Sequence, residues 1–247
     1  MSITSAAQTA ISQVLCTWET GSPTGGYDVI SILPDGAGFS GGRHQATVKG
    51  GNLPRIIQLY VDLRGMFAES FRAYLPRLKE SCDVDPKAIP AWCNDFMNLW
   101  RKAAAQDPVM FRRAQDHVFD AQYWAPMAQQ AEAMKLTLPL SWGVLYDIAI
   151  QSGPNGITDM RRLFVERPPS GGGSEMAWTR ALISSRRKWL ANFTSKYTGE
   201  KGANHTKIVR ATVYRMDGWA AVAAAENWAL TTPFMIPLRD RRITIPG

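Results

Sequence analysis

The sequence predicts an α+β fold that is mainly α-helical, with a small β-sheet near the N-terminus and a buried central helix. Apolar residues recur at helical spacing over most of the 247 residues. Residues 27–52 differ, because short extended stretches alternate there with closely spaced glycines, which is typical of a small hairpin sheet. Residues 141–152 are apolar on nearly every side, as expected of a helix at the centre of a domain.

A first helix is predicted over residues 5–18 with Ser5 as its cap, and the glycines and proline of residues 21–26 end it. Residues 27–52 contain the only convincing strands. The remaining segments with helical periodicity are 53–67, 91–105, 108–134, 141–152, 156–166, 175–197 and 206–229. The proline- and glycine-rich stretch 168–174 is interpreted as a loop within the same fold, because helical, apolar sequence continues after it.

Composition limits the function. The net charge of +7 indicates an anionic partner, but the basic residues are dispersed and no nucleic-acid motif occurs, so nucleic-acid binding is not expected. The three cysteines, Cys16, Cys82 and Cys93, lack the spacing of a disulfide scaffold or a zinc site. No phosphate-binding glycine motif is present, so no cofactor and no metal are expected. No run of 18 apolar residues exists, so no membrane span is expected.

Two carboxylates 16 positions apart, Glu19 and Asp35, are candidates for an acid/base pair. Glu19 follows the first predicted helix, where the negative end of the helix dipole favours a protonated carboxyl. Asp35 lies in Pro-Asp-Gly, which is also a common turn. Asp28 is a competing carboxylate that we interpret as a turn residue. His44 is either a base or ligand, or a hydrogen-bonded wall residue.

Asp147 lies inside the apolar helix 141–152. A buried charge is costly unless it is paired. Asp147 is therefore expected either to form a structural ion pair with one arginine, or to belong to an arginine–aspartate–arginine chain that ends at a catalytic carboxylate. The two interpretations are compatible.

Several segments resemble glycoside hydrolase family 46, the chitosanases and related domains of the lysozyme-like superfamily. Residues 35–42, D-G-A-G-F-S-G-G, are similar to the catalytic-aspartate pattern Asp-Gly-x-Gly-aromatic-Thr-Gly-Gly, with Ser40 replacing threonine. Glu19 matches the family's glutamate. The segments F-D-A-Q-Y-W-A-P, L-Y-D-I-A-I-Q-S-G-P and G-G-S-E-M-A-W-T-R-A-L-I-S-S-R-R are also similar, and they place Asp147 and Arg186 at family positions.

This resemblance implies a lysozyme-like two-lobed fold: one catalytic domain over residues 1–247, with a small β lobe at about 20–52. It implies an inverting mechanism in which Glu19 protonates the glycosidic oxygen and Asp35 activates a water that Ser40 helps to hold. Asp147, Arg186 and one more arginine would position Glu19. We assign that arginine to Arg210, with Lys207 and Arg215 as alternatives.

Two positions depart from the family. Asn52 stands where the family has a chitosan-binding aspartate, and Ala37 stands where it has an arginine. Chitosan is a polycation, so a chain of net charge +7 without that aspartate should be drawn instead to peptidoglycan and its anionic companions. The stretch G-R-H-Q also resembles phage-type lysozymes. We therefore expect His44, Gln45 and Asn52 to bind the substrate.

The sequence thus favours a muramidase-like peptidoglycan hydrolase that cleaves the β-1,4 glycan backbone, as in a phage endolysin, a virion lysin or a secreted effector. A chitosanase is the alternative, and an inactive wall-binding module is a third. The first 15 residues lack the features of a secretory signal. We expect synthesis in the cytoplasm and action on the wall, in the periplasm or outside, after holin-, virion- or secretion-system-dependent delivery. An immunity or delivery protein is then a candidate partner.

Overall fold

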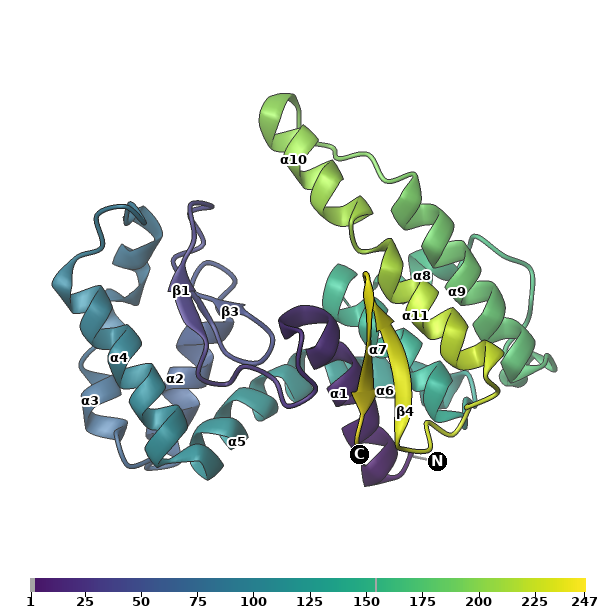
Figure 1. The fold of residues 1–247 in the computed structure, drawn as a ribbon, viewed down its shortest axis with the longest axis horizontal. Coiled ribbons are helices and arrows are strands. Elements are labelled where there is room, and N and C mark those ends of the chain that lie inside the picture. The colour runs from purple at the N-terminus through teal and green to yellow at the C-terminus, as the bar shows by residue number, and fades with distance from the viewer. Residues whose placement is uncertain (1–2, 154) are drawn as a thin grey trace. The chain divides into compact units, whose positions relative to one another are not determined.

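The computed structural model describes residues 3–153 and 155–247. Met1 and Ser2, which belong to the stretch that we compared with a secretory signal, and Pro154, the last residue of one family-like segment, lie outside the described residues. The chain forms two compact units: the larger unit, Met1–Pro23 with Tyr123–Gly247, and the smaller unit, Thr24–Gln122 (Figure 1). The sheet predicted within residues 20–52 lies in the smaller unit, which continues for another 70 residues of mostly helical chain.

The smaller unit packs a three-stranded antiparallel sheet with helices. Its strands are β1 (Ile30–Ile32), β2 (Phe39–Gly41) and β3 (Ala46–Thr47), in the order β1-β2-β3. The helices are α2 (Asn52–Asp62), α3 (Ala68–Arg72), the 3₁₀ helix η1 (Leu75–Asp83), α4 (Ala91–Gln106) and α5 (Pro108–Phe119). Aromatic rings fill the core of this unit in edge-to-face and tilted pairs, which add to the energy of area burial. They include Phe39, Tyr60, Phe71, Phe96, Trp100 and Phe111.

Tyr60 makes a polar contact at the edge of this aromatic core. Its side chain is fully buried, and its hydroxyl donates to Asp107 Oδ2 at 2.6 Å. Asp107 lies between α4 and α5, and the same oxygen accepts the N–H of Met66 at 2.8 Å. Burial, and then the neighbouring Asp107 carboxylate, raise the pKa of Tyr60 well above its ordinary value of 10.

We predict a pH-dependent cost for Tyr60→Phe. The folded pKa lies above the unfolded one, so the stabilisation by the tyrosine is fully present below pH 10 and is lost as the pH rises further. Wild type should exceed the variant by about 1.5–3 kcal/mol in unfolding free energy at pH 8, because a hydrogen bond to a carboxylate is lost. Urea unfolding of both proteins between pH 8 and pH 11 measures this difference. A difference that stays constant above pH 10 would contradict the prediction.

The larger unit is built around the helix α7 (Pro139–Ser152). Every residue of α7 from Leu140 to Ala149 is buried. It contacts α1 (Ser5–Thr20), α6 (Ala125–Ala133), α8 (Gly156–Arg161), α9 (Glu175–Ala191) and α11 (Val213–Ala224). The predicted buried central helix is therefore confirmed, as is the mainly helical fold class with small antiparallel sheets.

The larger unit also contains the short 3₁₀ helix η3 (Pro169–Gly171), the helix α10 (Gly199–Arg210) and a C-terminal hairpin. The hairpin strands β4 (Phe234–Leu238) and β5 (Arg241–Ile245) pair antiparallel. Our sequence analysis did not predict this hairpin. Proline and charged residues interrupt its alternation of apolar side chains, although Ile236, Leu238 and Ile245 are buried.

Several predicted helix boundaries were wrong. The predicted helices 53–67, 156–166 and 175–197 end earlier, at Asp62, Arg161 and Ala191. Thr4, and not Ser5, caps α1, since Thr4 Oγ1 accepts the N–H of Ala7 at 3.2 Å. The predicted helix 108–134 is α5, the π-helix η2 (Asp120–Trp124) and α6, whose second residue, Pro126, has no N–H to continue the preceding turn. The predicted helix 206–229 is divided between α10 and α11, and Thr212 Oγ1 donates to the last turn of α10 at Val209 O. Within the described residues, no helix has the length and apolarity that a membrane crossing requires.

Candidate active site

Glu19 lies in the last turn of α1. The helix ends at Gly21, which takes a left-handed conformation with φ of 80° and donates its N–H to Thr17 O at 2.9 Å. A left-handed glycine is a common helix stop because it carries no Cβ. The helix thus presents Glu19 at its C-terminal end, as the sequence predicts, with 14% of its side chain exposed.

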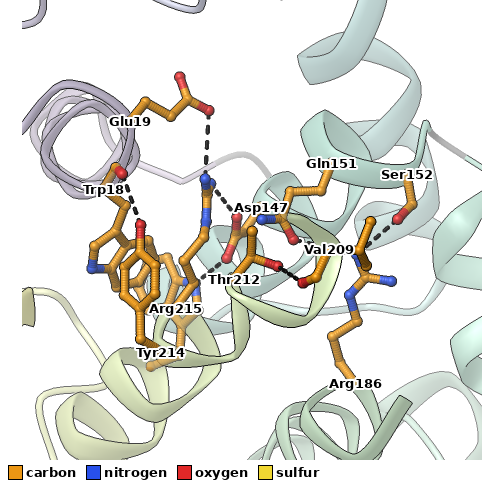
Figure 2. A network of polar contacts seen from close by, with 11 residues as sticks. Trp18, Glu19, Asp147, Gln151, Ser152, Arg186, Val209, Thr212, Tyr214 and Arg215 are labelled. Carbon is orange, nitrogen blue, oxygen red and sulfur yellow. Dashed lines mark hydrogen bonds and ion pairs between the residues drawn. The ribbon is translucent and has the colours of Figure 1, made fainter. Parts of the chain in front are cut away.

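Arg215 connects Glu19 to the buried Asp147 (Figure 2). Its Nη1 lies 3.7 Å from Glu19 Oε1, and its Nη2 donates to Asp147 Oδ1. Asp147 has no exposed surface, and its second oxygen accepts the indole N–H of Trp219 at 3.1 Å. Burial alone would lower the pKa of Arg215, but the carboxylates of Asp147 and Glu19 together outweigh burial and raise that pKa above its ordinary value. Arg215 is therefore a permanent cation beside Glu19.

Tight aromatic packing fixes this network. The Arg215 guanidinium lies 5.5 Å from the Trp18 ring, and Trp18 meets Trp219 edge to face at 5.1 Å. Tyr214 donates its hydroxyl to Trp18 O at 2.9 Å, which ties α11 to the end of α1. Glu19 and Arg215 are thereby held by the backbone of two helices, which restricts their side-chain geometry.

Arg186 lies beside this network without joining it by an ion pair. Within the described residues, its Nη2 donates to Ser152 Oγ at 2.7 Å and to Gln151 Oε1 at 3.3 Å, and no salt bridge to Asp147 forms. Its guanidinium stacks 4.5 Å from the Trp189 ring. Burial lowers the pKa of Arg186 to about 10, with Asp147 acting in the opposite direction. Asp147 therefore influences Arg186 electrostatically.

Arg210 does not occupy the position that we assigned to it. It is exposed at the end of α10 and donates to Phe193 O at 2.8 Å. Arg215, one of the two alternatives, takes that position. The chain turns between α10 and α11 at Ala211 and Thr212, so Arg210 and Arg215 lie on separate helices.

Asp35 lies on the segment between β1 and β2 in the smaller unit, and Ser40 lies within β2. Asp35 is exposed, and its Oδ1 accepts the N–H of Ala37 at 2.9 Å, which forms a tight turn of the Asx type. Ser40 is 6% exposed and pairs with Thr47 across the sheet. The structure thus presents a solvated carboxylate five residues before a sheltered hydroxyl.

Ser81, which our sequence analysis did not identify, anchors the segment that carries Asp35. Its buried hydroxyl accepts the N–H of Phe39 at 3.2 Å and donates to Leu78 O at 2.6 Å. Ser81 packs directly against Gly38, since a Cβ on Gly38 would lie only 2.5 Å from Ser81 Oγ. No signal in the sequence connects Ser81 to Phe39, since the contact joins segments 42 positions apart.

We predict that Ser81→Ala lowers the unfolding free energy by about 1–3 kcal/mol, because the buried N–H of Phe39 loses its acceptor. Ser70→Ala, at an exposed position of the same unit, should change it by less than about 0.5 kcal/mol. Chemical denaturation measures both values. Equal costs for the two variants would show that Ser81 does not anchor the segment.

The three predicted substrate-binding residues also lie in the smaller unit. The His44 ring lies 4.7 Å from the Phe119 ring, and the preceding Arg43 is fixed by an ion pair to Asp116 at 2.7 Å. Gln45 is exposed and takes a left-handed conformation. Asn52 is the first residue of α2, and its Oδ1 is buried with no hydrogen-bond partner in the described part of the chain. Their role in binding stays a prediction.

The family model of Glycosyl hydrolase family 46 matches residues 13–234, so the chain belongs to that family and is a glycoside hydrolase. A chitosanase of Bacillus subtilis (strain 168) is 26% identical over 231 residues, which cover 91% of this chain and 79% of the relative. The endolysin branch of our sequence analysis stays a prediction.

Solved structures confirm the fold. A mutant chitosanase from Bacillus subtilis MY002, complexed with 6 GlcN, is similar with a TM-score of 0.79 and 21% identity, covering 99% of this chain and 100% of that one. A Gynuella sunshinyii family 46 chitosanase in complex with chitotetraose gives a TM-score of 0.78 and 23% identity, with complete coverage of both chains.

Proposed function

We propose that the protein hydrolyses β-1,4-linked glucosamine polymers of the chitosan type, with Glu19 as the general acid and Asp35 as the general base. The observation that carries this proposal is the Glu19–Arg215–Asp147 arrangement in a chain of Glycosyl hydrolase family 46. The relatives named above are described as chitosanases, which favours this substrate over peptidoglycan, the first choice of our sequence analysis.

The proposed mechanism assigns different tasks to the two carboxyl groups. Glu19 gives its proton to the glycosidic oxygen as the bond breaks, and Arg215 holds the resulting carboxylate in place. Asp35, exposed to solvent, takes a proton from a water that attacks the opposite face of the sugar, and Ser40 helps to hold that water. The product then has the inverted anomeric configuration.

Peptidoglycan remains a second candidate because of two observations. The chain has a net charge of +7, and Asn52 supplies no carboxylate for an ammonium group. Both features weaken the attraction to a polycation and strengthen the attraction to an anionic wall polymer.

Parallel digestion of the two polymers tests the proposal. The purified protein should release more reducing ends from chitosan than from peptidoglycan at equal glycan mass, and Asp35→Asn should remove most of the release from both. Mass spectrometry of the peptidoglycan digest identifies any new reducing end. If reducing ends are released faster from peptidoglycan, with muramic acid at the new ends, then peptidoglycan and not chitosan is the substrate.

A further inference from the structure

The C-terminal hairpin forms one wall of a cavity beside Glu19. This cavity, of about 390 Å³, lies within the larger unit and is lined by Trp18, Glu19, Gly21, Tyr214, Leu238, Arg239, Asp240 and Arg241. The family match ends at residue 234, so the hairpin residues of this wall come from beyond the matched region. Residues close to Glu19 thus come from a part of the chain that the family model does not describe.

Both arginines of this wall are exposed, and each lies close to a residue that lines the cavity. The Arg239 guanidinium lies 5.9 Å from the ring centre of Tyr214, whose hydroxyl is bonded to Trp18 O. Arg241 Nη2 lies 3.1 Å from the position that a Cβ on Gly21 would take, against the C-terminal end of α1. A cation is favoured there, because the last backbone carbonyls of a helix carry partial negative charge.

Turn geometry does not explain an arginine at position 239. The pairing of Leu238 with Arg241 leaves Arg239 and Asp240 as a two-residue turn. Arg239 takes a left-handed conformation with φ of 54°, where such turns favour asparagine, aspartate or glycine. A longer side chain is disfavoured in this conformation, because its Cβ crowds the following carbonyl oxygen. Residues that break a local rule in this way often serve a functional site.

The charged hairpin residues that line the cavity disfavour a cationic ligand. Apart from Glu19, which pairs with Arg215, the charged residues that line the cavity are Arg239, Asp240 and Arg241. In the described part of the chain, no ion pair joins Asp240 to either arginine. The wall therefore contributes two cations against one anion, and its guanidinium N–H groups can donate only to acceptors.

We propose that this cavity is a subsite for an N-acetylated glucosamine residue and disfavours a protonated glucosamine. The oxygen of an acetamido group accepts hydrogen bonds from a guanidinium, whereas an ammonium group has no lone pair to offer and is repelled. This inference rests on the proposed function and extends it: the substrate is a partially N-acetylated glucosamine polymer, and the hairpin turn selects the sugar beside Glu19.

The test is the composition of the chain ends that wild type produces from partially N-acetylated chitosan. Sequencing of the product oligosaccharides by mass spectrometry should show one of the two new ends enriched in N-acetylglucosamine by about two- to fivefold over the polymer, the effect that exposed charges support. The double variant Arg239→Ala with Arg241→Ala should lose the enrichment. Arg242→Ala, the matched control, should keep it, because Arg242 does not line the cavity.

Salt provides a second measurement that needs no variant. Raising the ionic strength from roughly 0.05 to 0.5 M screens exposed charges and should reduce the enrichment in wild type. Two results would overturn the subsite and leave the proposed function standing. In one, the new chain ends produced by wild type have the same N-acetylglucosamine content as the polymer. In the other, the double variant keeps the enrichment unchanged. An absence of new ends with wild type would overturn the proposed function and the subsite together.

Discussion

Glu19→Gln is expected to lower the kcat of glycan hydrolysis by about 10²–10⁴-fold while the protein stays folded. A glutamine fills nearly the same space but has no carboxyl proton to give to the leaving oxygen, and general acid catalysis contributes an effect of this size. Initial rates of reducing-end release measure the loss. Urea unfolding should show a small change, because Arg215 keeps its contact with Asp147.

Glu166→Gln is the matched control for this substitution. Glu166 is exposed in the same unit and does not line the cavity beside Glu19, so its loss should leave kcat unchanged. The assignment of the acid would be wrong if Glu19→Gln retained more than about half of the wild-type rate.

Arg215→Ala is expected to lower the unfolding free energy by about 3–5 kcal/mol, because it leaves the fully buried Asp147 with the indole N–H of Trp219 and without a cation. Activity per folded molecule should also fall, since Glu19 loses the cation at its base. Chemical denaturation and initial rates measure the two effects separately.

Arg210→Ala removes the same side chain five residues earlier. Arg210 is exposed and bonded to a backbone oxygen, so its loss should cost less than about 0.5 kcal/mol and leave the rate unchanged. A larger cost for Arg210→Ala than for Arg215→Ala would contradict the network described above and favour our first assignment.

Local signals were sufficient to place much of the candidate site. The glycines after residue 20 predicted the end of α1 and placed Glu19 at its C-terminal end, although the predicted helix stopped at residue 18 and the observed one includes Glu19. The apolar surroundings of Asp147 predicted a buried carboxylate that needs a cation, which Arg215 supplies. Residues 35–42 predicted the turn and strand that carry Asp35 and Ser40.

Contacts between distant segments were not predictable in this way. The choice between Arg210 and Arg215 depends on the break at Thr212, which separates two helices that the pattern presented as one. Trp219 had a signal that we did not use, because it lies four residues after Arg215 and thus on the same helix face. The hairpin wall has no such signal, since β4 and β5 are short and contain proline and charged residues.

The net charge was a weak guide to the substrate. A value of +7 describes the whole surface, and it led our sequence analysis to peptidoglycan, whereas the relatives are chitosanases. Local charges at the cavity beside Glu19 are more informative, because exposed charges are screened beyond about 10 Å. In our proposal, Arg239 and Arg241 select a neutral sugar within a glucosamine polymer.

The most direct test of the central claim is the anomeric configuration of the first product. Time-resolved proton NMR of a chitosan oligomer during the first minutes of hydrolysis distinguishes the two anomers before they interconvert. The proposed inverting mechanism, with Glu19 as acid and Asp35 as base, predicts that the α-anomer forms first from the β-linked substrate. Initial formation of the β-anomer, or no cleavage of the oligomer, would contradict the account.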